Sequence, residues 1–175
     1  MKKFALAAAL AGVSTLAMAN SGYYVQGNVG YSKLEAKELG KKLKDSGASY
    51  SVAVGKDTGA VRYQLDYTDF GKFSDKAEVV WETTMRSVGL SAIYDFAPVS
   101  GVTPYAGARL GVNQAENDHA KDTVVAAGVL AGVQYAINPN LALDAGVEYN
   151  HLGEFFSTDA KINQYGAKVG LRYNF

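Results

Sequence analysis

Two histidines are the residues of this chain that could most readily do acid–base or metal chemistry, because cysteine is absent. His151 is followed by Glu154 and Ser157, and a histidine, a serine and a carboxylate are the groups of a nucleophilic hydrolase site. The alternative for His151 is an unreactive histidine at a polar–apolar boundary. His119 stands on a separate segment, and two histidines on different segments make a weak metal site. We therefore expect no catalytic residue, no metal, no cofactor and no enzymatic activity.

A run of lysines is the second candidate for chemistry. Five lysines, beginning at Lys33, lie between residues 33 and 44, interrupted by Glu35, Glu38 and Asp45. They could clamp the phosphates or sulfates of a polyanion, or they could form a solvated face. Four aromatic residues in other polar segments could anchor a partner or rest among lipid headgroups. The candidate contact residues are Lys37, Lys41, Lys42, Lys44, Phe73, Trp81, Phe155 and Phe156.

The elements that carry these residues are predicted from a strict alternation, which is clearest in residues 164–175. Successive side chains of a strand point to opposite faces. One face here is apolar: Tyr165, Ala167, Val169, Leu171, Tyr173 and Phe175. The other face is polar: Gln164, Gly166, Lys168, Gly170, Arg172 and Asn174. The segment therefore predicts a strand with one apolar and one charged face.

The same alternation recurs about eight times along the chain. A lysine or arginine facing lipid costs roughly 2–4 kcal/mol at mid-bilayer, so charges sorted to one face indicate which face avoids lipid. Seven charges near the segment centres fall on the polar rows, and Asp95 joins them near the end of its segment: Arg62, Asp66, Arg109, Asp144, Glu148, Lys168, Arg172 and Asp95. The pattern predicts an all-β fold, an eight-stranded antiparallel transmembrane up-and-down β-barrel, apolar outside and polar inside. The expected strands are residues 22–32, 49–56, 60–70, 84–96, 103–114, 123–137, 141–152 and 164–175.

The connections between these segments predict the topology. Those after the second, fourth and sixth strands are short, and the three prolines (Pro98, Pro104 and Pro139) lie in them or directly beside them, whereas the others are longer and polar. Short turns face the periplasm and longer loops face outward in such barrels. Aromatic residues should gather at the two rims. The periplasmic rim takes Tyr23, Tyr94, Phe96, Tyr135, Tyr173 and Phe175, and the outer rim takes Tyr31, Tyr50, Tyr67 and Tyr149.

The N-terminus has the features of an export signal: Lys2 and Lys3, an apolar run, and a small-residue cleavage site at residues 17–19. We expect residues 1–19 to be removed and residues 20–175 to form one barrel domain in a Gram-negative outer membrane, most simply as a monomer. Loss of the two lysines leaves 15 basic and 17 acidic residues, a balance that argues against nucleic-acid binding. The final strand, with Leu171, Tyr173 and Phe175, is the expected signal for the barrel-assembly machinery.

The interior of such a barrel is just wide enough to be filled by side chains. Four cations and four anions are expected there, and a buried unpaired charge is costly, so we predict a network of pairs. In the last hairpin, Asp144 should lie near Arg172 and Glu148 near Lys168. A closed polar plug and a narrow ion pathway are the two alternatives for this interior.

Three segments resemble the opacity family of outer-membrane proteins: residues 91–96 (SAIYDF), 104–110 (PYAGARL) and 135–150 (YAINPNLALDAGVEYN). The resemblance covers essentially the whole mature chain. It implies an eight-stranded barrel, in a family often called porins, whose members use surface loops to bind host receptors or glycans. No ligand-contact residue is carried over from it.

We therefore expect a protein of envelope structure and surface interaction, with lipopolysaccharide and a host receptor or glycan as partners. A small passive channel is the first alternative. A lipid A-modifying enzyme is the second, although the histidine-x-serine pattern of lipid A deacylases is absent because Gly153 stands two residues after His151. A soluble lipocalin-type barrel is the third, and it would need an apolar interior.

Overall fold

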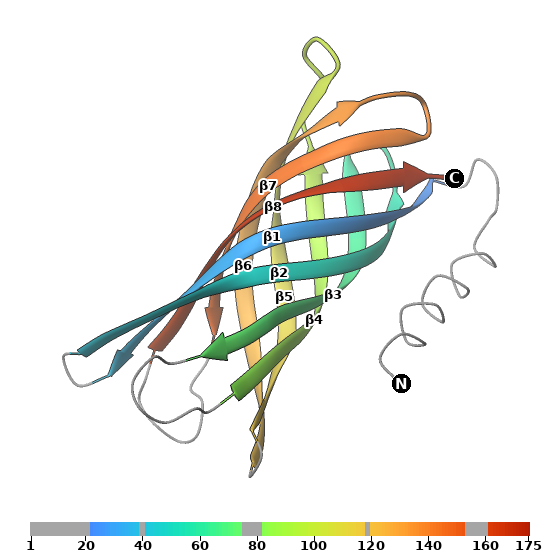
Figure 1. Cartoon of the computed structure of the whole chain (residues 1–175). Helices are drawn as coiled ribbons and strands as arrows, with labels where there is room; N and C mark the ends of the chain where they lie inside the picture. Colours follow the sequence, from blue (N-terminus) through green and yellow to red (C-terminus); the bar gives the residue numbers. More distant parts are fainter. Residues whose placement is uncertain (1–21, 39–40, 75–81, 118–119, 153–160) are drawn as a thin grey trace.

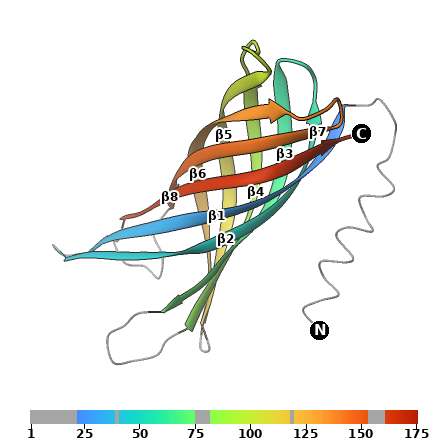
Figure 2. The same cartoon turned by 45° about the horizontal axis from the view of Figure 1, so that its top comes forward.

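The computed structural model describes residues 22–38, 41–74, 82–117, 120–152 and 161–175, with side chains except at residues 36–38, 41–45, 71–74, 82–84, 115–117, 120–122 and 161–162. The described residues form eight antiparallel strands that close into one barrel in sequence order (Figures 1 and 2). The strands are β1 (Tyr23–Glu38), β2 (Lys41–Asp57), β3 (Val61–Ser74), β4 (Glu82–Asp95), β5 (Val102–Asn117), β6 (Ala120–Ala136), β7 (Leu141–Leu152) and β8 (Lys161–Asn174). The predicted fold class is confirmed.

None of the described ranges contains a helix long and apolar enough to cross a membrane.

The barrel is closed by its first and last strands. β1 pairs with β8 over fourteen residue pairs, from Tyr24 opposite Asn174 to Lys37 opposite Lys161. The amide of Phe175 donates to the carbonyl of Tyr23 at 3.0 Å, so the two ends of the described chain meet at one rim. The carboxyl end lies beside the start of β1 in Figure 1.

Tight turns at this rim join β2 to β3, β4 to β5, and β6 to β7. The first is stabilised by the Asp57 side chain, which accepts a hydrogen bond from the Gly59 amide at 2.9 Å. Gly59 has φ 101°, a value that a residue without a Cβ adopts at little cost. In the third turn the Asn138 side chain accepts from the amides of Asn140 and Leu141. The predicted short turns are thus all at one end, together with the carboxyl terminus.

At the opposite rim the strands are longer than predicted. β1 and β2 continue until only residues 39–40 separate them, and β5 and β6 until only residues 118–119 do. The predicted long connections after the first and fifth strands are therefore mostly paired strand. The register places residues of opposite charge at paired positions in these extensions, Glu35 opposite Lys44 and Glu116 opposite Lys121, and such pairings favour a hairpin.

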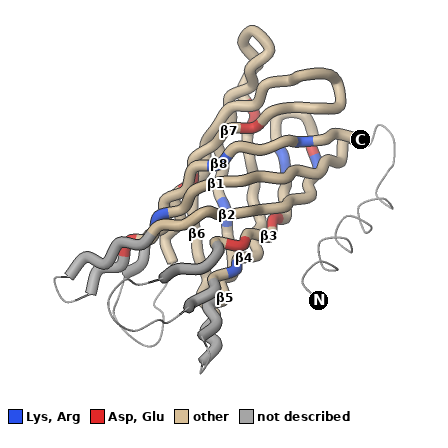
Figure 3. The backbone as a smooth tube through the Cα atoms, in the orientation of Figure 1, with Lys and Arg blue, Asp and Glu red and all other residues tan. Residues whose placement is uncertain are grey.

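The wall is apolar outside and polar inside, as predicted. Leu90, Leu110 and Val125 are 64–67% exposed on the outer surface, whereas Arg62 is 1% exposed in the lumen. Figure 3 shows how sparse charged positions are along the wall. A soluble lipocalin-type barrel is contradicted by this arrangement, because it needs the reverse.

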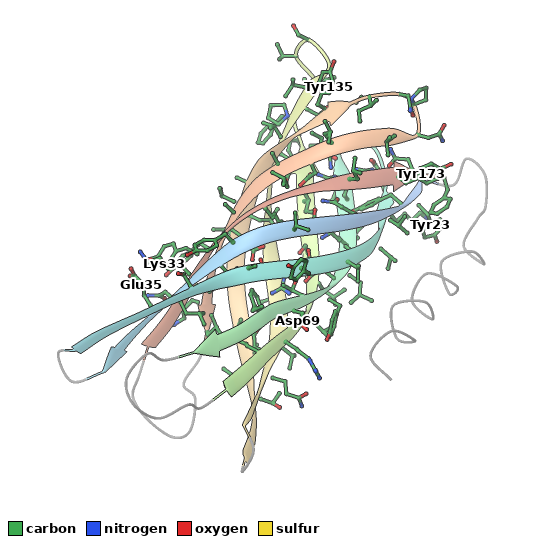
Figure 4. All side chains as sticks on the ribbon, viewed as in Figure 1. Tyr23, Lys33, Glu35, Asp69, Tyr135 and Tyr173 are labelled. Atoms are coloured by element: carbon green, nitrogen blue, oxygen red, sulfur yellow. The ribbon has the colours of Figure 1, made fainter. Side chains whose placement is uncertain are left out.

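Aromatic residues mark the rim with the turns. Tyr94 and Phe96 contact each other in a T-shaped arrangement with centroids 5.1 Å apart, and Tyr173 and Phe175 do so at 5.2 Å. Figure 4 places Tyr23, Tyr135 and Tyr173 toward this end. Tyrosines are also exposed on the outer wall toward the other rim, at Tyr31, Tyr50, Tyr67 and Tyr149.

Candidate functional site: the lumen and the outer rim

Two of the three arginine–aspartate pairs of the described lumen join residues of the predicted interior set. Arg109 Nη2 is 2.6 Å from Asp66 Oδ2, and Arg109 Nε donates to the same carboxylate at 3.1 Å. Arg62 Nε is 2.6 Å from Asp95 Oδ2, and its Nη2 donates to Oδ1 at 2.8 Å. All four residues belong to the predicted interior set. Arg109 is on β5 and Asp66 on β3, so this pair bridges strands that are not neighbours in the sheet.

The last hairpin contains one of its two predicted pairs. Lys168 Nζ is 3.0 Å from Glu148 Oε2, as predicted. The predicted pair of Asp144 with Arg172 is wrong, because Arg172 Nη2 is 2.6 Å from Asp57 Oδ2 instead. The register does not distinguish the two pairs, because Asp144 and Arg172 are offset by the same two positions as Glu148 and Lys168. The difference lies in the other partners of Arg172, on β1, β2 and β6.

Arg172 is held by side chains of β1 and β2 on one side and of β6 on the other. Its guanidinium lies 3.9 Å from the centre of the Tyr24 ring, and its Nη1 donates to Gln134 Oε1 at 3.1 Å. The sequence reading placed Asp57 in a turn and missed it as a lumen residue. The signal was available, because Asp57 continues the inward row of Ala53 and Gly55 by one more step.

Asp144 accepts hydrogen bonds from two neutral side chains. Its Oδ1 accepts from the Tyr105 hydroxyl at 3.0 Å and its Oδ2 from Gln134 Nε2 at 3.2 Å. It is 3% exposed, and no ion pair within 4.0 Å joins it to another described residue. The described lumen therefore holds one more carboxylate than cations.

The lumen is not polar throughout, which the sequence reading missed. Toward the outer rim, an apolar layer of inward residues packs across the barrel, with Leu34 against it: Phe70, Met85, Val124, Ala126 and Leu152. A second cluster of Ile93, Tyr105 and Leu130 lies deeper. The alternation could have found the layer, because Phe70 is one step beyond Thr68 on an inward row and Met85 one step before Ser87.

Inward glycines make room for the largest lumen side chains. A Cβ at Gly89 would lie 2.4 Å from Arg109 Cζ, and one at Gly111 would lie 2.6 Å from Arg109 Nη1. A Cβ at Gly132 would lie 2.5 Å from the Tyr105 hydroxyl. The glycines of the inner rows thus leave the space that the side chains of Arg109 and Tyr105 occupy.

Little space remains between these side chains. A cavity of about 10 Å³ lies beside Glu148 and Lys168, which is close to the smallest volume that holds one water molecule. A larger hollow of about 570 Å³ opens at the rim with the tight turns, and Asp57, Asp95 and Arg172 are among its lining residues.

The outer wall carries polar side chains near the outer rim. His151 Nδ1 is 2.9 Å from Asn163 Oδ1, which also accepts from the Tyr149 hydroxyl at 3.1 Å. Ser157 and Glu154, which sequence reasoning considered with His151, lie outside the described residues. Lys33 Nζ is 3.7 Å from Glu35 Oε1 on the outer face of β1. Figure 4 places this pair toward the end opposite Tyr23 and Tyr173.

The predicted loop contacts are only partly described. Lys37, Lys41, Lys42, Lys44 and Phe73 belong to described strands, but their side chains lie outside the described part of the chain. Trp81, Phe155 and Phe156 lie outside the described residues altogether, as does His119. Within the described residues, no three histidine, aspartate or glutamate side chains are grouped so that they could hold a metal ion.

The final strand presents its apolar row to the outside. Leu171 is 51% and Tyr173 44% exposed on the wall, and Phe175 completes the row at the rim.

Several known proteins are similar to this chain in sequence and in fold. The family model described as "Opacity family porin protein" matches residues 54–175. "Protein opa" of Haemophilus influenzae is 38% identical over 130 residues, which cover 70% of this chain and 100% of that protein. "Opacity protein opA50" of Neisseria gonorrhoeae is 29% identical over 183 residues, covering 71% of this chain and 77% of that protein.

Among solved structures, the crystal structure of Neisserial surface protein A (NspA) superposes with a TM-score of 0.70 and 32% sequence identity, covering 89% of this chain and 98% of that chain. The chain therefore belongs to the opacity family, and it is an integral β-barrel of the outer membrane.

Proposed function

We propose that this barrel is a closed anchor that presents surface hairpins outside the cell. The hairpins would contact the surrounding lipopolysaccharide and a host-cell receptor or glycan, and the lumen would pass no solutes. The observation that carries the proposal is the filled lumen, in which four ion pairs lie beneath the apolar layer.

Opening a path through this lumen would be costly. Separating one partner of a buried pair from the other costs roughly 3–5 kcal/mol. The Arg109–Asp66 pair joins β5 to β3 and the Arg172–Asp57 pair joins β8 to β2, so both cross over an intervening strand. A continuous pore would have to break such links and also wet the apolar layer.

Conductance tests the closed lumen directly. Pure, refolded monomer in a planar bilayer should give no large, steady openings, with a general porin run in the same cell as the positive control. The family's description carries the word porin, so a small passive channel is the second candidate. Large, stable conductance steps from the monomer would establish that candidate and overturn the closed anchor.

Surface contact is supported by the family and by the hairpins that extend beyond the wall. Relatives at 29% identity are named opacity proteins of Neisseria gonorrhoeae. A pull-down of host and envelope components on the folded protein should recover partners. A version with the β1–β2 and β5–β6 extensions shortened should lose them, and equal recovery by both versions would contradict the role of the hairpins.

Export and assembly complete the proposal. Residues 1–19 would be removed on export, and mass spectrometry of the mature protein should give a chain that starts near Asn20. The row of Leu171, Tyr173 and Phe175 would be recognised by the barrel-assembly machinery, and deletion of Phe175 should lower the assembled fraction in cells.

The opacity family is not known for enzymes, and we propose that this member is no exception. Lipid A from cells that overproduce the protein should have an unchanged mass spectrum. A loss or gain of one acyl chain would show a lipid-modifying activity instead.

A further inference from the structure

The β1–β2 hairpin continues the register of the wall beyond the tyrosines of the outer rim. Its residue pairs run from Tyr31 opposite Ala48 to Glu38 opposite Lys41 without a shift. Because strand positions alternate between two faces, the row of positions that contains Tyr31 continues outward from the lipid-facing wall. That row consists of Lys33, Glu35 and Lys37 on β1 and Lys42, Lys44 and Ser46 on β2.

The register separates charges that are mixed in the sequence. The outward row has four lysines and one glutamate, a net charge of +3. The other row continues the lumen-facing positions, and it holds one lysine and two acids: Leu34, Ala36, Glu38, Lys41, Leu43 and Asp45. Two of the three acids that interrupt the lysine run are therefore on the other row. The inner row also begins with Leu34, which packs against the apolar layer.

The outward row lies at the height of lipid headgroups. Tyr31 and Tyr50 are 58% and 60% exposed on the wall, as rim aromatics are, and the row begins directly beyond them. A strand rises about 3.3 Å per residue, so Lys33 is about 7 Å and Lys37 about 20 Å beyond Tyr31 along β1. With a strand tilt of about 45°, these become heights of roughly 5 Å and 14 Å above the rim.

We propose that the outward row of the β1–β2 hairpin binds the phosphates of lipopolysaccharide in the surrounding outer leaflet. This inference rests on the proposed function and names the surface for one of its partners. Lipid is the occupant because the row continues the wall that acyl chains contact, where phosphorylated headgroups stand beside it. Lys33 has a side chain that is 45% exposed and lies 3.7 Å from Glu35 Oε1, so its ammonium group is accessible to an anion.

Two adjacent lysines give a matched test, because Lys42 is on the outward row and Lys41 on the inner row. Native mass spectrometry and titration in mixed micelles would measure binding of bisphosphorylated lipid A to the full mature barrel. Lys42→Gln should weaken binding roughly fivefold at low salt, as expected for one lysine near an anionic surface. Lys41→Gln should change it less than twofold. The triple variant K37Q/K42Q/K44Q should lose roughly a hundredfold, with the loss shrinking as salt screens the charges.

Folding and the ligand are controlled separately. Lys37 and Lys42 stand opposite each other, so their removal takes away a like-charge pair and should leave the hairpin and the gel mobility of the folded barrel intact. Lys44 stands opposite Glu35, so the gel mobility of the triple variant is compared with that of K37Q/K42Q. Lipid A without phosphates should bind the unaltered protein as weakly as the phosphorylated lipid binds the triple variant.

Equal effects of Lys41→Gln and Lys42→Gln, or unchanged lipid binding by the triple variant, would overturn the inference. A triple variant that loses heparin binding but keeps lipid A binding would assign the row to a soluble polyanion and would overturn it as well. Conductance through the lumen would overturn the closed anchor and leave these binding results standing, so the two failures can be told apart.

Discussion

Removal of the Asp66 carboxylate is the sharpest test of how the lumen is held together. In Asp66→Ala the guanidinium of Arg109, which is 5% exposed in the unaltered barrel, keeps its full charge and loses its three hydrogen bonds to that carboxylate. The remaining partner is the Ser87 hydroxyl, at 2.9 Å from Arg109 Nη2. Leaving one member of a buried ion pair unpaired costs roughly 3–5 kcal/mol. A new hydrogen bond from the charged guanidinium would recover only about 1.5–3 kcal/mol of that cost. The bond to Ser87 exists already, so it offsets nothing new.

The expected loss is therefore about 3–5 kcal/mol of the free energy of unfolding, a large share of the roughly 5–15 kcal/mol of a typical domain. Urea titration in lipid vesicles, followed by the gel mobility of the folded barrel, would measure it. Glu148→Ala is the internal comparison, because the Lys168 side chain is 19% exposed and can turn toward water. It should cost less than half as much.

The double variant D66A/R109A separates the lost pair from the stranded charge. It should be more stable than D66A, because the unpaired guanidinium is gone, and the coupling between the two changes should exceed about 2 kcal/mol. A D66A protein that unfolds at the same urea concentration as the unaltered barrel would refute the reasoning. Additive effects of the two changes would refute it equally.

Three further predictions use the same urea measurement. Asp144→Asn should leave stability unchanged or raise it by up to about 1 kcal/mol, because it removes a carboxylate that accepts hydrogen bonds from two neutral side chains; a loss above 2 kcal/mol would show that a cation does pair with it. Gly89→Ala should cost about 1–3 kcal/mol, since the new Cβ would lie 2.4 Å from Arg109 Cζ, whereas Gly27→Ala, where nothing lies within 4 Å, should be nearly neutral. Leu110→Arg should cost roughly 2–4 kcal/mol in vesicles, because Leu110 is 64% exposed on the lipid-facing wall, and an equal loss in a short-chain detergent would argue against lipid contact as the cause.

The fold could be predicted because a single period of two orders the whole sequence. Charges such as Arg62 and Asp66 can face only one way in a wall that touches lipid, so they define both the register and the inside of the barrel. The pairing of Glu148 with Lys168 was predicted from the positions of inward residues along the two strands of the last hairpin.

The rest depended on how strands are staggered around the barrel, which no single segment specifies. Arg172 reaches Asp57 across β1, and a hairpin count cannot foresee a partner on another strand. The strand extensions near Glu35 and Lys44 were missed because polar, charged residues are typical of loops. Only the register shows that residues of opposite charge occupy paired positions there. The alternation indicates that Phe70, Met85 and Leu152 face inward, but these residues come from three separate strands, and only closure of the barrel shows that they pack as one layer.

The pairing of β1 with β8 has a consequence for biogenesis. Until the last residues are in place, the growing sheet has two open edges, and each exposes amide and carbonyl groups that hydrocarbon cannot satisfy. If the sheet entered the bilayer before β1 and β8 could form their fourteen residue pairs, those amide and carbonyl groups would lie in hydrocarbon without hydrogen-bond partners. Pairing of β1 with β8 therefore requires the complete chain, and it is expected to be a late and cooperative step of folding.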